Sequence, residues 1–118
     1  MAKITKNFST SEMQCPCCDK CNMDFQFMEE LQRIRELCRF GFKFNSAYRC
    51  AEYNNKVSKN TRGQHVTGKA VDISIKDRYK RFSLLKEAIE SMYFKDIAIA
   101  GNFIHLGKGN TKNGIGVY

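Results

Sequence analysis

The sequence of 118 residues contains no long apolar run. No stretch approaches the roughly eighteen consecutive apolar residues that a membrane-spanning helix needs. Residues 1–6 are basic but lack the apolar stretch of a signal peptide. Internal repeats, low-complexity tracts and linkers are also missing. We therefore expect one domain, residues 1–118, that is monomeric, has no membrane span and is made in the cytoplasm.

Acidic residues are few relative to basic ones, with 12 Asp and Glu against 20 Lys and Arg and a formal net charge of +8. Such an excess favours an anionic partner: nucleic acid, a membrane surface or an acidic cell-wall polymer. An anionic wall accounts for the charge as well as nucleic acid does, so we expect no specific nucleic-acid partner. The apolar content of 42% is typical of a globular chain.

Helical and strand patterns alternate along the chain. Three helices are expected, at residues 24–40, 50–57 and 77–93. Five strands are expected, at residues 42–45, 69–75, 97–100, 103–106 and 114–118. Two further segments are expected to be irregular, at residues 1–22 and 58–68. The predicted fold class is α+β, with a small antiparallel sheet and helices packed on one side.

Caps and apolar spacing refine the two long helices. Asp24 is expected to cap the first of them, and Gly41 is expected to end it. The inward positions of the first helix are expected to be Phe27, Leu31, Ile34, Leu37 and Cys38. Those of the last helix are expected to be Phe82, Leu85, Ala88, Ile89 and Met92. The strands at 97–100 and 103–106 are expected to form a hairpin.

Histidine is scarce, and both copies, His65 and His105, lie in patterns that suggest a metal site. Asp72 follows His65 by seven positions, and His105 lies forty residues beyond His65. Apolar neighbours flank Asp72, so its carboxylate points opposite to them on a strand and needs a charged partner or a metal. Either histidine alone is typical of a structural residue. Together, two imidazoles and one carboxylate are the ligand count of a catalytic zinc site with an open fourth position.

Four segments, in order along the chain, resemble one family. His65-x-x-Gly68-x-Ala70-x-Asp72 resembles the signature of the peptidase M15-like family, which contains zinc D-Ala-D-Ala carboxypeptidases and phage cell-wall endopeptidases. Residues 46–54 resemble its Ser-Gly-Tyr-Arg block, residues 103–105 the block of the last metal ligand, and residues 8–18 the N-terminal segment of its small single-domain branch.

The resemblance implies a function and a site. It implies a phage endolysin or wall-remodelling enzyme that cuts stem peptides or crosslinks of bacterial peptidoglycan after release from the cell. It implies Zn²⁺ bound by His65, Asp72 and His105. It also implies that Arg49 binds substrate or stabilises the oxyanion, and that the fold is similar to that of hedgehog and DD-peptidase domains.

The chain departs from this family where a general base is expected. Asn102 and Gly107 stand where many members carry an acidic residue, and Gly63 stands where a serine is common. Asp96 and Glu52 are the nearest alternative carboxylates in the sequence. A second interpretation therefore stays open: an inactive zinc-binding module that binds the wall or serves as a virion component. A third is a basic nucleic-acid-binding protein with metal at its cysteines and none at its histidines.

Six cysteines are many for a chain of this size. Four of them fall within residues 15–21, in overlapping Cys-x-x-Cys pairs. A second metal site or a set of disulfides is predicted from Cys15, Cys18, Cys21 and Cys50. Free thiols are the remaining alternative. In each case the cysteines are expected to anchor the N-terminal segment, because a catalytic cysteine needs a histidine partner and both histidines serve the other site.

Overall fold

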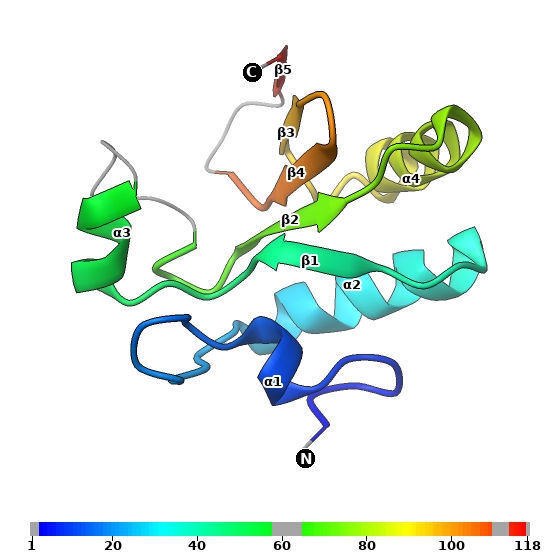
Figure 1. Cartoon of the computed structure of the whole chain (residues 1–118). Helices are drawn as coiled ribbons and strands as arrows, with labels where there is room; N and C mark the ends of the chain where they lie inside the picture. Colours follow the sequence, from blue (N-terminus) through cyan, green and yellow to red (C-terminus); the bar gives the residue numbers. More distant parts are fainter. Residues whose placement is uncertain (1–2, 58–64, 110–113, 118) are drawn as a thin grey trace.

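The computed structural model describes residues 3–57, 65–109 and 114–117, and its elements alternate between helices and strands (Figure 1). The elements are α1 (Thr10–Met13), α2 (Phe25–Cys38), β1 (Lys43–Ser46), α3 (Ala51–Val57), β2 (Ala70–Ser74), α4 (Arg78–Ser91), β3 (Asp96–Ile99), β4 (Phe103–Gly107) and β5 (Gly114–Val117). The predicted α+β class is confirmed. Residues 58–64 of the loop predicted at 58–68, which include Gly63, lie outside the described residues, and so does Tyr118.

The five strands form one sheet in the order β1-β2-β4-β3-β5. The predicted hairpin of β3 and β4 is confirmed, and the pairs among β1, β2, β4 and β3 are all antiparallel. The predicted edge strand β5 pairs in parallel with β3, so the sheet is mixed and not wholly antiparallel. The end of β4 lies opposite the start of β3, where Gly107 pairs with Asp96. Since β5 begins there too, with the Gly114 amide donating to the Lys95 carbonyl, it runs in the same direction as β3.

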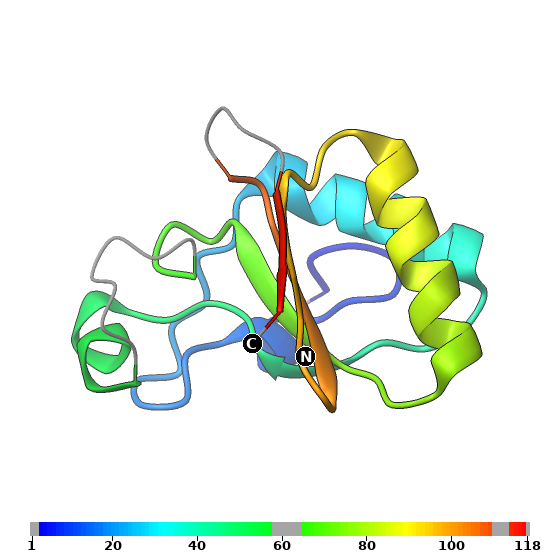
Figure 2. The ribbon, with the colours of Figure 1, turned by 90° about the horizontal axis from the view of Figure 1, so that it is seen from above.

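Helices α2 and α4 cover one face of the sheet, and α3 lies on the other side (Figure 2). Between these two helices and the sheet lies the main part of the core, formed by Phe27, Met28, Leu31, Ile34, Val71, Ile73, Leu84, Ala88, Ile97, Ile104 and Leu106. The prediction of helices on one side therefore holds for the two long helices. The opposite face of the sheet carries Asp72 and His105.

Asp24 caps α2 as predicted, and its carboxylate accepts a hydrogen bond from the Phe27 amide at 3.0 Å. The other end of this helix differs from the prediction. Arg39, with φ of 63°, adopts the left-handed conformation that ends the helix, and Gly41 lies beyond it. Leu37, expected to face inward, is 55% exposed.

The buried face of α4 also differs from the prediction. Leu84 and Ala88 are fully buried, whereas the exposed fractions of Phe82, Ile89 and Met92 are 68%, 46% and 66%. The expected inward face is therefore right in part, since Ala88 is buried and Leu85 packs against the core. The centre of the buried face is shifted by about one residue, which is about 100° around a helix. Asp77 begins the helix as predicted, with its carboxylate accepting from the Lys80 amide.

A charged side chain explains this rotation of α4. Arg81 lies on the same stripe as Leu84 and Ala88, at helical spacing. Its guanidinium donates to the carbonyl oxygens of Ile75 at 2.8 Å and Ala100 at 2.6 Å. Because a charged residue occupies the first position of the inward stripe, this stripe does not look apolar in the sequence. The spacing of apolar residues therefore predicted that the neighbouring face of α4 is buried.

The N-terminal segment is more ordered than expected, because it contains the helical turn α1. Phe8 and Met13 anchor it, with exposed fractions of 2% and 0%. The Tyr48 amide donates to the Met13 carbonyl at 3.0 Å, so the segment is tied directly to the residue before Arg49. In the described ranges, the helices are too short and too polar to cross a bilayer.

Candidate metal centre

Asp72 on β2 and His105 on β4 lie directly opposite each other in the antiparallel ladder. Residues paired in this way project from the same face of a sheet. His65 reaches the same place from the turn that precedes β2. Ligand-capable atoms of the three residues lie within 4.8 Å of one another, and the residues are only 6%, 7% and 7% exposed for His65, Asp72 and His105. The three residues that the sequence singled out therefore converge.

His65 is held by a backbone carbonyl. Its Nδ1 lies 2.7 Å from the carbonyl oxygen of Ala47. A carbonyl only accepts, so Nδ1 carries the proton and Nε2 keeps its lone pair. That Nε2 lies 3.5 Å from Oδ2 of Asp72. A hydrogen bond on one ring nitrogen that directs the other inward is the usual arrangement of a metal-binding histidine.

Asp72 is ionised at the centre of this group. Burial raises the pKa of its carboxyl, but the hydrogen bond from His105 and the nearby His65 imidazole outweigh burial and hold the pKa well below its usual range. Nδ1 of His105 lies 2.8 Å from Oδ1 of Asp72. The carboxylate therefore offers a fixed negative charge between two imidazoles.

This donor set suits a zinc ion. Zinc in proteins is bound by imidazole nitrogen and carboxylate oxygen at about 2.0 to 2.2 Å, which puts neighbouring ligands of a tetrahedron about 3.4 Å apart. The 3.5 Å between His65 Nε2 and Asp72 Oδ2 agrees with that spacing. The distance of 2.8 Å between Asp72 Oδ1 and His105 Nδ1 is shorter because a hydrogen bond joins these two atoms. Three protein ligands leave a fourth position for water or substrate.

Arg49 lies beside this group, in the segment between β1 and α3. Its Nε donates to Ser46 Oγ at 2.9 Å, and its Nη1 donates to Asn54 Oδ1 at 3.3 Å. Its Nη2 is directed to Asp72, 3.7 Å from Oδ2, and its side chain is 16% exposed. Two neutral acceptors thus hold the guanidinium so that its remaining nitrogen faces the metal-binding residues.

The carboxylates considered as general bases lie in different environments. Asp96, at the start of β3, has Oδ2 at 3.8 Å from Nε2 of His105, and its side chain is 47% exposed. It pairs across the ladder with Gly107. Glu52 is an exposed residue in the first turn of α3. Asn102 is exposed in the turn between β3 and β4.

Gly68 joins the turn that carries His65 to the start of α2. Its φ of +74° is a conformation that glycine adopts without strain, and a Cβ there would lie 2.2 Å from the carbonyl oxygen of Asn22. The Asp24 amide donates to the Gly68 carbonyl at 3.0 Å. The backbone at Gly68 therefore passes close to residues 22–24, and this contact fixes the turn that leads to the metal-binding residues.

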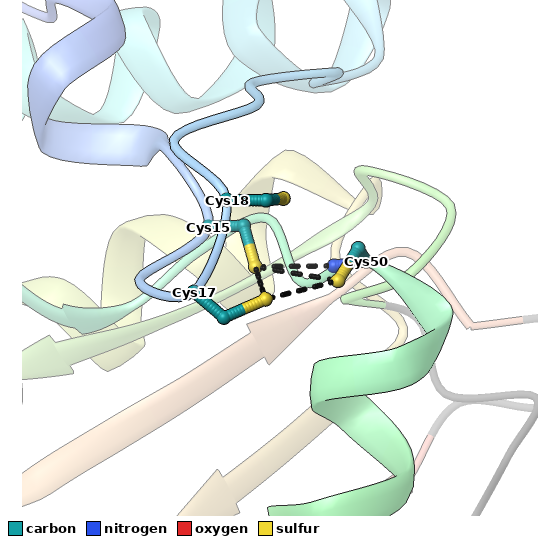
Figure 3. A group of neighbouring side chains, drawn as sticks. All are labelled: Cys15, Cys17, Cys18 and Cys50. Atoms are coloured by element: carbon teal, nitrogen blue, oxygen red, sulfur yellow. Dashed lines mark hydrogen bonds between the residues drawn. The ribbon is translucent and has the colours of Figure 1, made fainter.

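A second group of metal-binding side chains consists of Cys15, Cys17, Cys18 and Cys50 (Figure 3). Cys17 takes the place that the sequence interpretation assigned to Cys21, which instead packs against the hydrophobic core. All six cysteines are free. Burial raises the pKa of Cys15, but hydrogen bonds from Cys50 and Cys17 outweigh it and lower the pKa to about 6.

Sequence reasoning missed three contributors to these two groups. The Ser46 hydroxyl that holds Arg49 was visible in the Ser-Gly-Tyr-Arg-like block, but nothing in that block assigned it a partner. The Ala47 carbonyl that orients His65 has no side-chain signal at all. The choice of Cys17 over Cys21 depends on how the chain turns between them.

Comparison with protein families gives a match over most of the chain. A protein-family model described as Peptidase M15 matches residues 6–107. The matched range includes His65, Asp72, His105 and Arg49. No curated protein matches the chain.

Proposed function

The chain belongs to the peptidase M15 family, as its sequence motifs predicted, and on that premise we propose that it is a zinc-dependent peptidase acting on bacterial peptidoglycan. The bonds that it cuts are those of stem peptides or their crosslinks. The observation that carries the proposal is the convergence of His65, Asp72 and His105 on one sheet face, with Arg49 directed to them.

In this proposal the two histidines and Asp72 hold the zinc ion. When bound there, zinc supplies Lewis-acid polarisation of a scissile carbonyl and lowers the pKa of water towards about 7. The protein orients the ligands beforehand, since the Ala47 carbonyl fixes the His65 ring and Asp72 fixes the His105 ring. Pre-oriented ligands lose little conformational freedom when a metal binds.

Arg49 is proposed to bind the oxygen on which negative charge develops, or a carboxylate of the substrate. A guanidinium carries its charge at every relevant pH and presents donors in a planar fork. Its Nε and Nη1 are already bonded to Ser46 and Asn54, so Nη2 is the donor directed to the site. A donor held in advance at the place of developing charge stabilises the transition state more than the ground state.

Asp96 is proposed as the general base. Its carboxylate is near His105 yet half exposed, so it reaches both the site and solvent. It would take a proton from the attacking water and give that proton to the leaving amine. Gly107 has no carboxylate, and Asp96 lies opposite to it on the neighbouring strand. Asp96 therefore supplies a carboxylate close to the position of Gly107.

The net charge of +8 supports an anionic wall as the partner. Attraction between a basic protein and an acidic polymer raises the local concentration of enzyme at its substrate. Salt screens such attraction, because the Debye length falls to about 8 Å at physiological ionic strength. The protein would act on the wall after its release from the cell.

Hydrolysis of purified peptidoglycan tests the proposed function. Zinc-loaded protein is expected to release new amino groups from at least one wall type or stem peptide. A chelator should stop the release, and added zinc should restore it. The His65→Ala, His105→Ala double variant serves as the inactive control.

A failure of this experiment would favour the alternative function. If the zinc-loaded protein releases no amines from any wall type, but sediments with the wall, a wall-binding or virion-structural module becomes the better description. The presence of Asn102 and Gly107 at the expected acidic positions is the observation that keeps this alternative open.

Replacement of Arg49 by lysine is expected to lower the cleavage rate by at least about tenfold, equivalent to about 1.4 kcal/mol of transition-state stabilisation. Lysine keeps the positive charge but cannot donate to Ser46, Asn54 and the site at once, since it has one nitrogen on a flexible stem. Zinc content should be unchanged. Arg33→Lys, an exposed change on α2, is the matched control. Equal rates for Arg49→Lys and this control would remove Arg49 from the mechanism.

A further inference from the structure

Three cysteine sulfurs lie close together where the N-terminal segment meets the start of α3 (Figure 3). The Sγ atoms of Cys15 and Cys17 are 3.5 Å apart, those of Cys15 and Cys50 are 3.6 Å apart, and those of Cys17 and Cys50 are 3.3 Å apart. The sulfur of Cys18 lies within 4.8 Å of the other three. Four sulfurs from two distant parts of the chain thus lie close together.

These separations agree with metal binding. Zinc–sulfur bonds of about 2.3 Å put the sulfurs of a tetrahedral site about 3.8 Å apart. A disulfide would need a sulfur–sulfur distance of about 2.05 Å. Any one disulfide would also leave two of the four thiols beside it without a partner. A single tetrahedral ion satisfies all four sulfurs together.

The local backbone supports the arrangement. The Cys15 amide donates to the Lys20 carbonyl at 2.7 Å, and the Asp19 amide donates to the Cys15 carbonyl at 2.9 Å, with Asp19 in the left-handed conformation. This tight turn brings the three N-terminal cysteines to one side. The Cys50 amide donates to Cys15 Sγ at 3.4 Å, and the Tyr53 amide donates to Cys50 Sγ at 3.4 Å. Backbone amides directed at sulfur stabilise the negative charge of a thiolate.

We propose that Cys15, Cys17, Cys18 and Cys50 bind a second zinc ion in a closed four-thiolate site. Four protein ligands leave no open position, so this ion has a structural role. Its ligands differ entirely from those of the histidine site, and the proposal stands whether or not the chain cleaves peptidoglycan.

A metal ion in the thiolate site would hold Arg49 in position. Cys50 follows Arg49 directly, and Tyr48 before it is bonded to Met13 in the N-terminal segment. The Arg49 amide also donates to the His65 carbonyl at 3.1 Å. An ion that joins residues 15–18 to Cys50 therefore fixes the segment that carries Arg49 and contacts the His65 turn.

Metal analysis of the variants tests the proposal. Wild-type protein loaded with zinc and dialysed should hold two equivalents. The Cys17→Ser, Cys50→Ser double variant should hold one, and the His65→Ala, His105→Ala variant should also hold one. Cys38→Ser, which removes a cysteine outside the group, should keep two. A Cys17→Ser, Cys50→Ser protein that is folded and still holds two equivalents would overturn the proposal.

Three measurements on the wild type cover the case in which the cysteine variant does not fold. Replacement of zinc by cobalt should produce sulfur-to-cobalt charge-transfer absorption, which the histidine site cannot give. At most two of the six thiols should react with a thiol reagent until a chelator is added. Rapid reaction of all six thiols in the zinc-loaded protein would overturn the proposal. Intact-mass evidence that freshly purified protein holds disulfides among these four cysteines would do the same.

Discussion

Replacement of Asp72 by asparagine is expected to remove one equivalent of zinc from the protein and to abolish cleavage. Asp72 is the only charged oxygen donor among the three residues of the histidine site. An amide of the same shape keeps the packing but is a poor zinc ligand, since zinc sites use carboxylate oxygen, imidazole nitrogen and thiolate sulfur. The variant also leaves the Arg49 guanidinium without the negative charge that lies beside it in the wild type. The uncompensated positive charge repels a divalent ion.

The size of this effect follows from the position of Asp72. Loss of a hydrogen-bonding partner of a zinc ligand typically lowers metal affinity 10- to 100-fold, and Asp72 is itself a ligand in this proposal. The expected loss of zinc affinity is therefore more than about 100-fold. Competition with a chromophoric chelator measures the affinity, and elemental analysis measures the zinc content.

Two controls make the Asp72 result specific. Glu90→Gln removes one exposed negative charge on α4, across the sheet from the site, and should leave the zinc content unchanged. The thiol reactivity of the four grouped cysteines should also be unchanged in Asp72→Asn. If the zinc content and affinity of Asp72→Asn equal those of wild type, the first metal site does not involve this carboxylate.

Replacement of Asp96 by asparagine is expected to lower the rate of cleavage by about 10²- to 10⁴-fold while zinc stays bound. An amide cannot carry a proton from water to a leaving amine. The acidic limb of the pH profile of kcat/KM reports the free enzyme's base, so that limb should disappear in the residual activity. Glu52→Gln, an exposed change on α3, is the matched control and should retain the full rate.

A different role for Asp96 would give a different pattern. If Asp96 only helps to hold the zinc ion, its carboxylate lying 3.8 Å from the Nε2 that His105 would offer to zinc, its replacement should weaken zinc binding about 10- to 100-fold. Saturating zinc would then restore cleavage, and the acidic limb would remain. Loss of activity in Glu52→Gln, with full activity in Asp96→Asn, would transfer the role of the base to Glu52.

Local chemistry allowed much of the fold to be predicted. Asp24 and Asp77 begin the two long helices as expected, because a carboxylate that accepts a backbone amide acts within a few residues of its own position. The β3–β4 hairpin was likewise predicted from the two apolar strands around residues 101–102. Features that depend on neighbours in sequence are therefore visible without the tertiary structure.

Packing decided which faces are buried. The sequence of α4 offers apolar residues on two adjacent stripes, and the stripe that starts at Arg81 faces the sheet. That choice depends on carbonyl oxygens at the ends of β2 and β3, which no periodicity in α4 encodes. The exposure of Phe82 and Met92 is the consequence.

The candidate site divides in the same way. The sequence by itself determined that His65, Asp72 and His105 are the candidate zinc ligands, because the ligand types and the strand pattern around Asp72 are local properties. Only the tertiary structure decided the register that sets Asp72 opposite His105 and brings Asp96 within 3.8 Å of it. The same holds for the partners of Arg49 and for the selection of Cys17 over Cys21. Each of these depends on distances between segments far apart in the chain, and such distances exist only once the core between the sheet and α2 and α4 has formed.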